Sequence, residues 1–242
     1  MPNPNMANRE VCDLVLCDYN TQRPVLAMDY ANTTTTNVTG EAVYAYGGWS
    51  HPTRVTFTGN KGGTLVVETQ IQPFKLYGIL SGAAIQKTAK FLHKETVTVT
   101  EDNLQATLPS APVGPVNVFA HDDLETVVEA TVEGTAVTLP AAGEYDVYYV
   151  EEIKENVQKL NINNTTFPKA FTIYGNTIYK TEDDELLPFK MIYYKASPQS
   201  NFTITNSNTG DPTSLSITFD LMVNTDGDLM DMLLIEEDQS AL

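Results

Sequence analysis

The chain has 242 residues and a formal net charge of −17, from 14 basic and 31 acidic side chains. So acidic a protein repels nucleic acid at long range, which argues against a DNA- or RNA-binding function. The apolar runs are too short for a helix that spans a membrane, and the N-terminus lacks the basic and apolar regions of a secretory signal. This length can bury a core as one large β domain or two smaller ones.

The charge is uneven along the chain. Residues 1–120 hold 8 basic and 9 acidic side chains, whereas residues 121–242 hold 6 and 22. A solvent-exposed acidic face by itself explains such an excess of negative charge in the second half. A surface that nucleic acid passes without sticking is the sharper interpretation.

The two cysteines, Cys12 and Cys17, are five residues apart. On a straight strand their Cα atoms are about 17 Å apart and their side chains point to opposite faces. This separation is too large for a disulfide, and two ligands are too few for structural zinc. We therefore predict two reduced, structural thiols, and no cofactor.

In chain order, residues 1–9 are expected to be a flexible N-terminus, followed by strands near 11–17, 24–30 and 40–46. The threonine run 33–36 is expected to be a loop or a frayed edge. Apolar residues alternate with polar ones over 53–58 and 64–71. Glycines in the intervening segment 59–63 predict a hairpin turn there.

Pro73 begins the clearest predicted helix, over residues 73–82. Phe74 and Tyr77 recur at helical spacing, with Leu80 one turn further, and Gly82 is a natural C-terminal stop. About ten residues is short for a helix, so packing against the core must hold it.

The second half of the chain continues in strands and turns. Strands are expected at 94–100, 169–174 and 177–180, and prolines and a glycine predict a loop over 109–115. Residues 116–150 are expected to form an inserted β subdomain or a long β excursion, with strands at 116–120, 126–133, 136–139 and 145–150. Residues 151–162 suit either a helix or a strand, and the acidic residues 182–185 are expected to be a solvated loop.

The segment 214–223 shows the clearest alternation. Leu215, Ile217, Phe219, Leu221 and Val223 fall on one face and the intervening polar residues, Asp220 among them, fall on the other. Such a period of two predicts a half-buried strand.

Catalytic and metal-binding patterns are sparse. His51, His93 and His121 are scattered without the spacing of metal ligands, so structural roles are the preferred interpretation. The acidic runs lack the ligand spacing of a calcium loop. The sequence therefore predicts neither an enzyme nor a metal site.

Several segments together resemble bacteriophage tail tube (major tail) proteins. They are YAYGG at 44–48, RVTFTGNKGGTL at 54–65, ETQ at 68–70, LSGA at 80–83, FP at 167–168, FTIYG at 171–175 and GDPTSL at 210–215. The resemblance covers roughly residues 9–238 and is a pattern of strands and turns. It treats residues 10–242 as a single tail-tube-like β domain.

The resemblance implies a mainly β fold, a β-sandwich or barrel of antiparallel strands with one short flanking helix. Subunits of this family join in hexameric rings whose sheets close into an inter-subunit β-barrel, and the rings stack into a tube in the virion tail. Genomic DNA passes through it without tight binding. The expected partners are the chain itself and other tail proteins: sheath if the tail contracts, tape measure, baseplate and terminator. Synthesis is expected in the host cytoplasm, with no membrane contact.

Two sets of residues are the candidates for these roles. The proposed inter-subunit contact comprises Gly59, Asn60, Lys61, Gly62 and Gly63. The proposed acidic face toward the lumen comprises Glu129, Glu133 and Asp220, which the alternation places opposite the core.

Two alternative functions remain open at this point. One is another virion β protein, such as a capsid decoration or tail terminator protein. The other is a carbohydrate-binding or hydrolytic β-sandwich, which needs exposed aromatic platforms beside a carboxylate pair. The single tryptophan, Trp49, argues mildly against it, whereas 12 tyrosines leave it possible.

Overall fold

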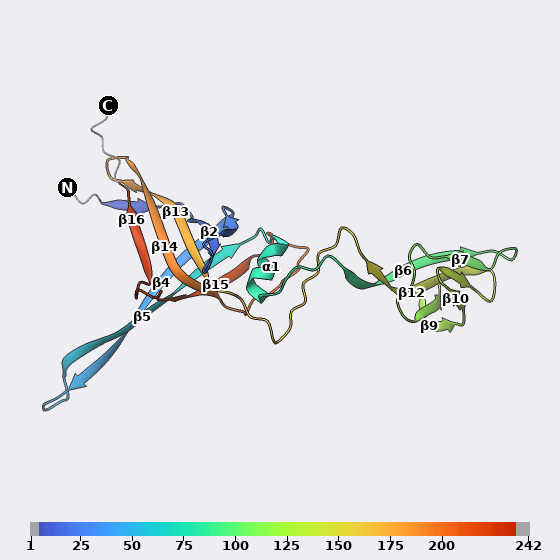
Figure 1. The fold of residues 1–242 in the computed structure, drawn as a ribbon, viewed down its shortest axis with the longest axis horizontal. Coiled ribbons are helices and arrows are strands. Elements are labelled where there is room, and N and C mark those ends of the chain that lie inside the picture. The colour runs from blue at the N-terminus through green and yellow to red at the C-terminus, as the bar shows by residue number, and fades with distance from the viewer. Residues whose placement is uncertain (1–4, 236–242) are drawn as a thin grey trace. The chain divides into compact units, whose positions relative to one another are not determined.

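The computed structural model describes residues 5–235 (Figure 1). The chain divides into two compact units. Unit 1 comprises Met1–Ala83 and Ile162–Leu242, and unit 2 comprises Ala84–Asn161. The block 116–150 therefore lies inside a larger inserted unit. In the described part of the chain, no helix is long and apolar enough to cross a membrane.

Unit 1 is built on one antiparallel sheet in the order β3-β2-β13-β14-β15-β5-β4. The short strands β1 and β16 pair with β13 and β14. The strands are β1 (Met6–Asn8), β2 (Asp13–Asp18), β3 (Pro24–Met28), β4 (Ala31–Tyr46), β5 (Thr53–Thr69), β13 (Phe171–Thr181), β14 (Leu186–Pro198), β15 (Leu215–Met222) and β16 (Met230–Leu234).

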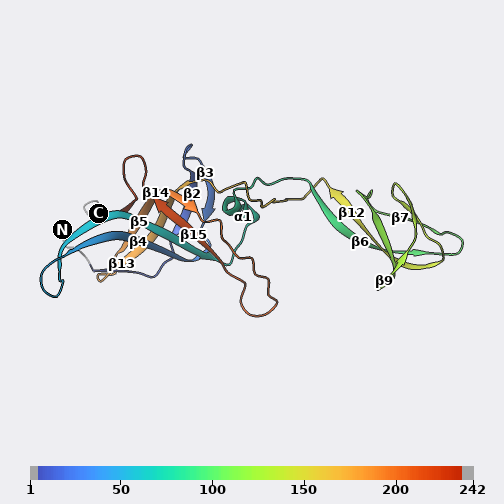
Figure 2. The same ribbon diagram turned by 90° about the horizontal axis from the view of Figure 1, so that it is seen from below.

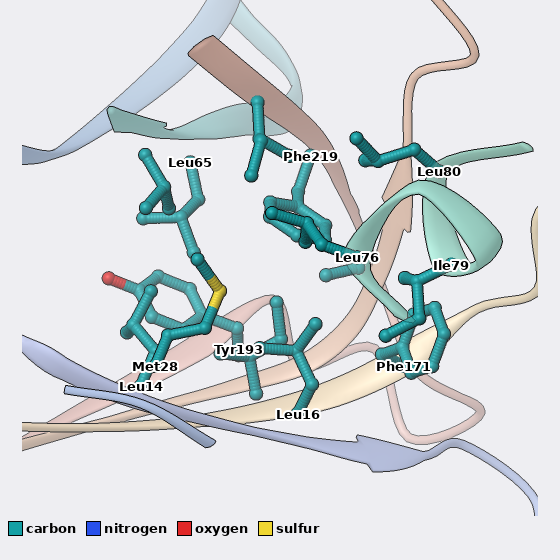
Figure 3. Close-up of a cluster of buried hydrophobic side chains, with 14 of the residues drawn as sticks. Leu14, Leu16, Met28, Leu65, Leu76, Ile79, Leu80, Phe171, Tyr193 and Phe219 are labelled. Atoms are coloured by element: carbon teal, nitrogen blue, oxygen red, sulfur yellow. The ribbon is translucent and has the colours of Figure 1, made fainter. Parts of the chain in front are cut away.

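The core of unit 1 lies between two layers of this sheet. Leu14, Leu16 and Tyr193 approach from β2 and β14, and Leu65 and Phe219 approach from β5 and β15 (Figure 3). The expected alternation is confirmed within β15, because Leu215, Ile217, Phe219 and Leu221 are all buried. It ends with the strand at Met222, and Val223, expected on the same face, is exposed. The fold is mainly β and sandwich-like, as expected.

The predicted helix is also confirmed. Helix α1 (Phe74–Ser81) follows Pro73 and ends at Gly82, which has a left-handed φ of 71°. It buries Leu76, Ile79 and Leu80 against the core (Figure 3). A side chain at Gly82 would also collide with the backbone of Phe167, because the added Cβ would lie 2.2 Å from the Phe167 carbonyl oxygen.

Strands β4 and β5 correct two expectations. Residues 33–36 belong to β4, where Thr36 Oγ1 and the hydroxyl of buried Tyr193 are hydrogen bonded at 2.6 Å. Residues 59–63 lie inside β5, and the turn of the hairpin falls instead between Tyr46 and Thr53. Close strand approach explains one of the glycines, since a Cβ at Gly63 would lie 2.4 Å from the Asn37 carbonyl oxygen. Figure 2 shows the two long strands side by side.

Unit 2 consists of two small antiparallel sheets, in the orders β6-β12-β8-β9 and β10-β11-β7. It has its own core, to which Val97, Val118 and Val147 belong. The strands are β6 (Ala89–Val99), β7 (Gln105–Thr107), β8 (Val116–Ala120), β9 (Asp123–Val128), β10 (Thr131–Glu133), β11 (Ala136–Thr138) and β12 (Gly143–Ile153).

Unit 2 corrects one predicted strand and settles an ambiguous segment. The expected strand 126–133 is two strands, β9 and β10, which belong to different sheets. Segment 151–162 continues β12 as far as Ile153 and is then irregular, with a bridge between Gln86 and Lys159. Two backbone hydrogen bonds of 2.9 Å join this pair, so the chain enters and leaves unit 2 through a paired stem.

Two further expectations concern surface segments. Residues 182–185 connect β13 to β14 and are exposed, as predicted. Residues 6–8, expected within a flexible N-terminus, instead form β1, whose backbone pairs with residues 179–181. Residues 1–4 of that expected segment lie outside the described residues.

Candidate functional site

One outward sheet face of unit 1 carries three cross-strand rows of mostly polar side chains. Strand alternation produces this face, since Leu65, Val67, Ile217 and Phe219 point the other way into the core. The register of β15 with β5 and of β5 with β4 aligns the rows. We call this surface the Thr-rich face; its residues are Thr33, Thr35, Asn37, Thr64, Val66, Glu68, Ser216, Thr218 and Asp220.

None of these nine side chains is a cation. Glu68 and Asp220 are the two carboxylates of the set, and each has a neutral partner. Thr33 Oγ1 donates to Glu68 Oε2 at 3.3 Å, and Gln199 Nε2 donates to Asp220 Oδ1 at 2.7 Å. A phosphate backbone passing over this face meets hydroxyls and negative charge, with no Lys or Arg among the nine to hold it.

The outer part of the β4–β5 hairpin, residues 38–62, is the projecting hairpin. Strand β15 pairs with β5 only over residues 63–69, so beyond Gly63 the two strands of the hairpin pair with each other alone in the described structure. Val43 and Phe57 face one another across the strands and are 65% and 60% exposed. A two-stranded ribbon is marginally stable in water, so exposed apolar side chains indicate a surface that a partner covers.

Strand β4 is also an open edge. It has 16 residues and pairs with β5 on one side, while no described residue pairs with its other side. A long edge strand presents unpaired backbone N–H and C=O groups that favour pairing with another chain. The edge and the projecting hairpin together form a candidate assembly surface.

The predicted contact residues fall on this surface. Gly59, Asn60, Lys61 and Gly62 lie in the projecting hairpin, and Gly63 lies at its base, within β5 rather than in a turn. Whether they contact a second subunit stays a prediction.

The three predicted acidic residues lie in two different units. Asp220 belongs to the Thr-rich face of unit 1, whereas Glu129 and Glu133 belong to unit 2. Glu133 ends β10, and Glu129 lies in the connection between β9 and β10 rather than on a strand. All three are exposed.

Unit 2 contains a charged cluster that the sequence did not reveal. Asp146 is 1% exposed and lies 2.9 Å from Lys94 Nζ through its Oδ2. Its Oδ1 accepts from Thr96 Oγ1 at 2.7 Å and lies 3.1 Å from His121 Nδ1. The backbone N–H of Asp122 donates to Oδ2 at 3.1 Å.

These contacts shift two pKa values. The bond from Lys94 does most to hold the pKa of Asp146 well below its usual range. The bond to Asp146, followed by the charges of Asp122 and Glu144, raises the pKa of His121. His121, Asp122 and Asp146 present ligand atoms within 4.8 Å of one another, but Lys94 already supplies the positive charge beside Asp146. The cluster depends on the pairing of β8 and β6 with β12, which no local sequence pattern predicts.

The remaining reactive groups have structural surroundings. Cys12 and Cys17 are both buried and free, as predicted. Burial raises the pKa of the Cys12 thiol to about 11, which disfavours the reactive thiolate. Ser110 Oγ donates to Glu151 Oε2 at 2.6 Å, and we interpret this as a structural hydrogen bond.

Unit 1 thus combines a projecting hairpin, an open edge strand and a sheet face without cations among its nine side chains. The model of the YomU/Tube protein family, a phage tube-type family, matches residues 9–233, and the chain belongs to this family. No curated protein matches the chain.

Proposed function

We propose that this chain is the structural, non-catalytic subunit of a phage tail tube. Copies join in rings, with six subunits as in the tail tube proteins that the sequence resembles, and the rings stack into a tube in the virion tail. Family membership supports the tube, and the open edge of β4 supports the closure of sheets between subunits. Such a closure removes the exposed edges that a single copy presents.

The Thr-rich face lines the lumen in this proposal. Its lack of cations among nine neighbouring side chains is the observation that carries the DNA-conduit function. Lys and Arg contacts to phosphate release counterions and so bind DNA. A wall without them lets genomic DNA slide past, and the carboxylates of Glu68 and Asp220 add repulsion.

The other partners follow from the tube. They are the tail proteins that the resemblance implies: a tape measure protein, a terminator, a baseplate and, if the tail contracts, a sheath. The chain is synthesised in the host cytoplasm and incorporated into the virion.

The test places a cation on the Thr-rich face. Thr218→Lys adds one lysine per subunit, about six per ring, whereas the control Thr209→Lys adds the same charge in the exposed loop before β15. Wild-type tubes are expected not to bind duplex DNA at physiological salt. With six phosphates contacted per ring, the affinity of Thr218→Lys tubes falls with salt at a slope of about −5 on logarithmic axes.

DNA binding by tubes is measured by co-sedimentation across a salt series, and genome release is timed in reconstituted particles. Slower release for Thr218→Lys than for Thr209→Lys supports the conduit. Micromolar DNA affinity of wild-type tubes, or equal behaviour of the two variants, contradicts it. Rings that never stack in electron micrographs favour a terminator instead.

A further inference from the structure

Trp49 stands at the tip of the projecting hairpin and is the single tryptophan of the chain. It is 99% exposed. The turn around it is tightly built: Gly48, Ser50 and His51 all have positive φ angles, of 90°, 71° and 50°. Arg54 Nε donates to the Gly47 carbonyl oxygen at 3.1 Å, which fastens the turn to β5. A left-handed backbone conformation is energetically unfavourable for non-glycine residues such as Ser50 and His51. The turn therefore adopts a strained conformation while it presents a large apolar ring to water.

A pocket of about 350 Å³ opens in the same unit, between β4 on one side and β13, β14 and β16 on the other. Phe189, Met191, Met230 and Met232 line it with apolar surface. Methionine side chains adapt their shape and make favourable sulfur contacts with aromatic rings. The volume is at the small end of ligand sites and leaves room for one aromatic side chain.

The pocket also carries acceptors for an indole N–H. Glu10 and Thr34 are among its lining residues. Buried tryptophan usually donates its N–H to such a partner. The ring therefore suits the pocket in size and apolar lining, and Glu10 supplies an acceptor for its N–H, whereas Thr34 Oγ1 already accepts from the Cys12 N–H at 3.2 Å.

Trp49 does not reach the pocket of its own chain. Val38 lines the pocket, and β4 continues to Tyr46 with shifts of register after Gly40 and Ala45. Eight further residues of strand extend up to about 26 Å beyond Val38 before the turn that carries Trp49 begins. The ring and the pocket are thus separate, complementary patches on one chain, and such a pair makes head-to-tail contacts that generate rings or filaments.

We propose that Trp49 of one copy inserts into the pocket of a second copy, with its ring between Phe189 and the methionines. The inference rests on the proposed function, that copies of the chain assemble, and it identifies the contact that holds them. Trp49 is then a binding hot spot, since tryptophan in a desolvated pocket dominates interface energies.

Because Trp49 is the single tryptophan, its fluorescence reports directly on the environment of this ring. Tryptophan fluorescence of the purified chain is recorded as concentration rises, with light scattering and electron microscopy on the same samples. On assembly the emission is expected to shift to shorter wavelengths, and quenching by iodide to fall several-fold. Rings or tubes whose tryptophan stays fully quenchable overturn the pocket contact and leave the tube function intact. Failure of the chain to assemble under any condition overturns both.

Three variants locate the contact. Trp49→Ala is expected to raise the concentration for half-assembly at least tenfold while the melting temperature stays unchanged, because the ring is exposed in the free chain. Met232 is 67% exposed and faces the pocket, whereas the next residue, Leu233, lines a groove on the opposite face of β16. Met232→Arg is expected to block assembly, and Leu233→Arg is expected to permit it. The reverse order, or normal assembly of Trp49→Ala, overturns the proposal.

Discussion

Helix α1 provides a sharp test of how unit 1 is held together. Leu76 is 0% exposed and belongs to the main core of the unit, together with Phe219 and Leu16. Replacing a fully buried leucine by alanine removes its burial and leaves a cavity, at a cost of about 3 kcal/mol. An eight-residue helix is not stable without its packing, so Leu76→Ala also loosens α1.

The expected cost corresponds to a fall of about 6–12 °C in the melting temperature of unit 1. Circular dichroism melting measures it, and unit 2, which has a core of its own, is expected to keep its transition. The control is Lys75→Ala on the exposed side of the same helix. Its effect is expected to stay below about 1 kcal/mol, the size of the lost surface hydrogen bond to Val25. Equal shifts for the two variants would show that α1 does not pack as described.

Three further predictions concern the sheet, the charged cluster and the insertion. Gly63→Ala is expected to destabilise unit 1 by about 1–3 kcal/mol in chemical unfolding, because its Cβ meets the Asn37 carbonyl oxygen at 2.4 Å; wild-type stability would contradict the close strand approach. Unit 2 is expected to melt at the highest temperature between about pH 4 and pH 6.5. The pKa of Asp146 is lowered from 3.8, so its stabilisation of unit 2 is complete above pH 3.8 and is lost as the pH falls through the folded-state pKa. The pKa of His121 is raised from 6.5, so its stabilisation is complete below pH 6.5 and is lost as the pH rises through the folded-state pKa. Asp146→Asn should remove the acid limb, and an unchanged pH profile would count against the cluster. Replacing Ala84–Asn161 by a short glycine linker is expected to leave the melting transition of unit 1 in place, since the paired stem at Gln86 and Lys159 brings the ends of the insertion together; an unfolded product would show that unit 1 needs the insertion.

The sequence alone determined the features that depend on neighbours along the chain. The alternation of 214–223 predicts β15, because a strand with one buried face must repeat every two residues. Pro73 and Gly82 mark the ends of α1, because each has a local conformational preference that suits a helix terminus. The β class and the resemblance to tail tube proteins follow from many such local patterns.

Only the tertiary structure decided which strands pair, and the site depends on that pairing. Gly63 looks like a turn residue in its own segment, and its contact with Asn37 exists only because β4 lies against β5. Asp146 meets Lys94 because β12 pairs with β6, and it meets His121, the residue after β8, because β12 also pairs with β8. Glu129 and Asp220 look alike in a charge pattern, yet they fall in separate units. Period-two alternation fixes which side of a strand is buried, but strand register is set by contacts between residues far apart in sequence, and those contacts define the Thr-rich face and the pocket.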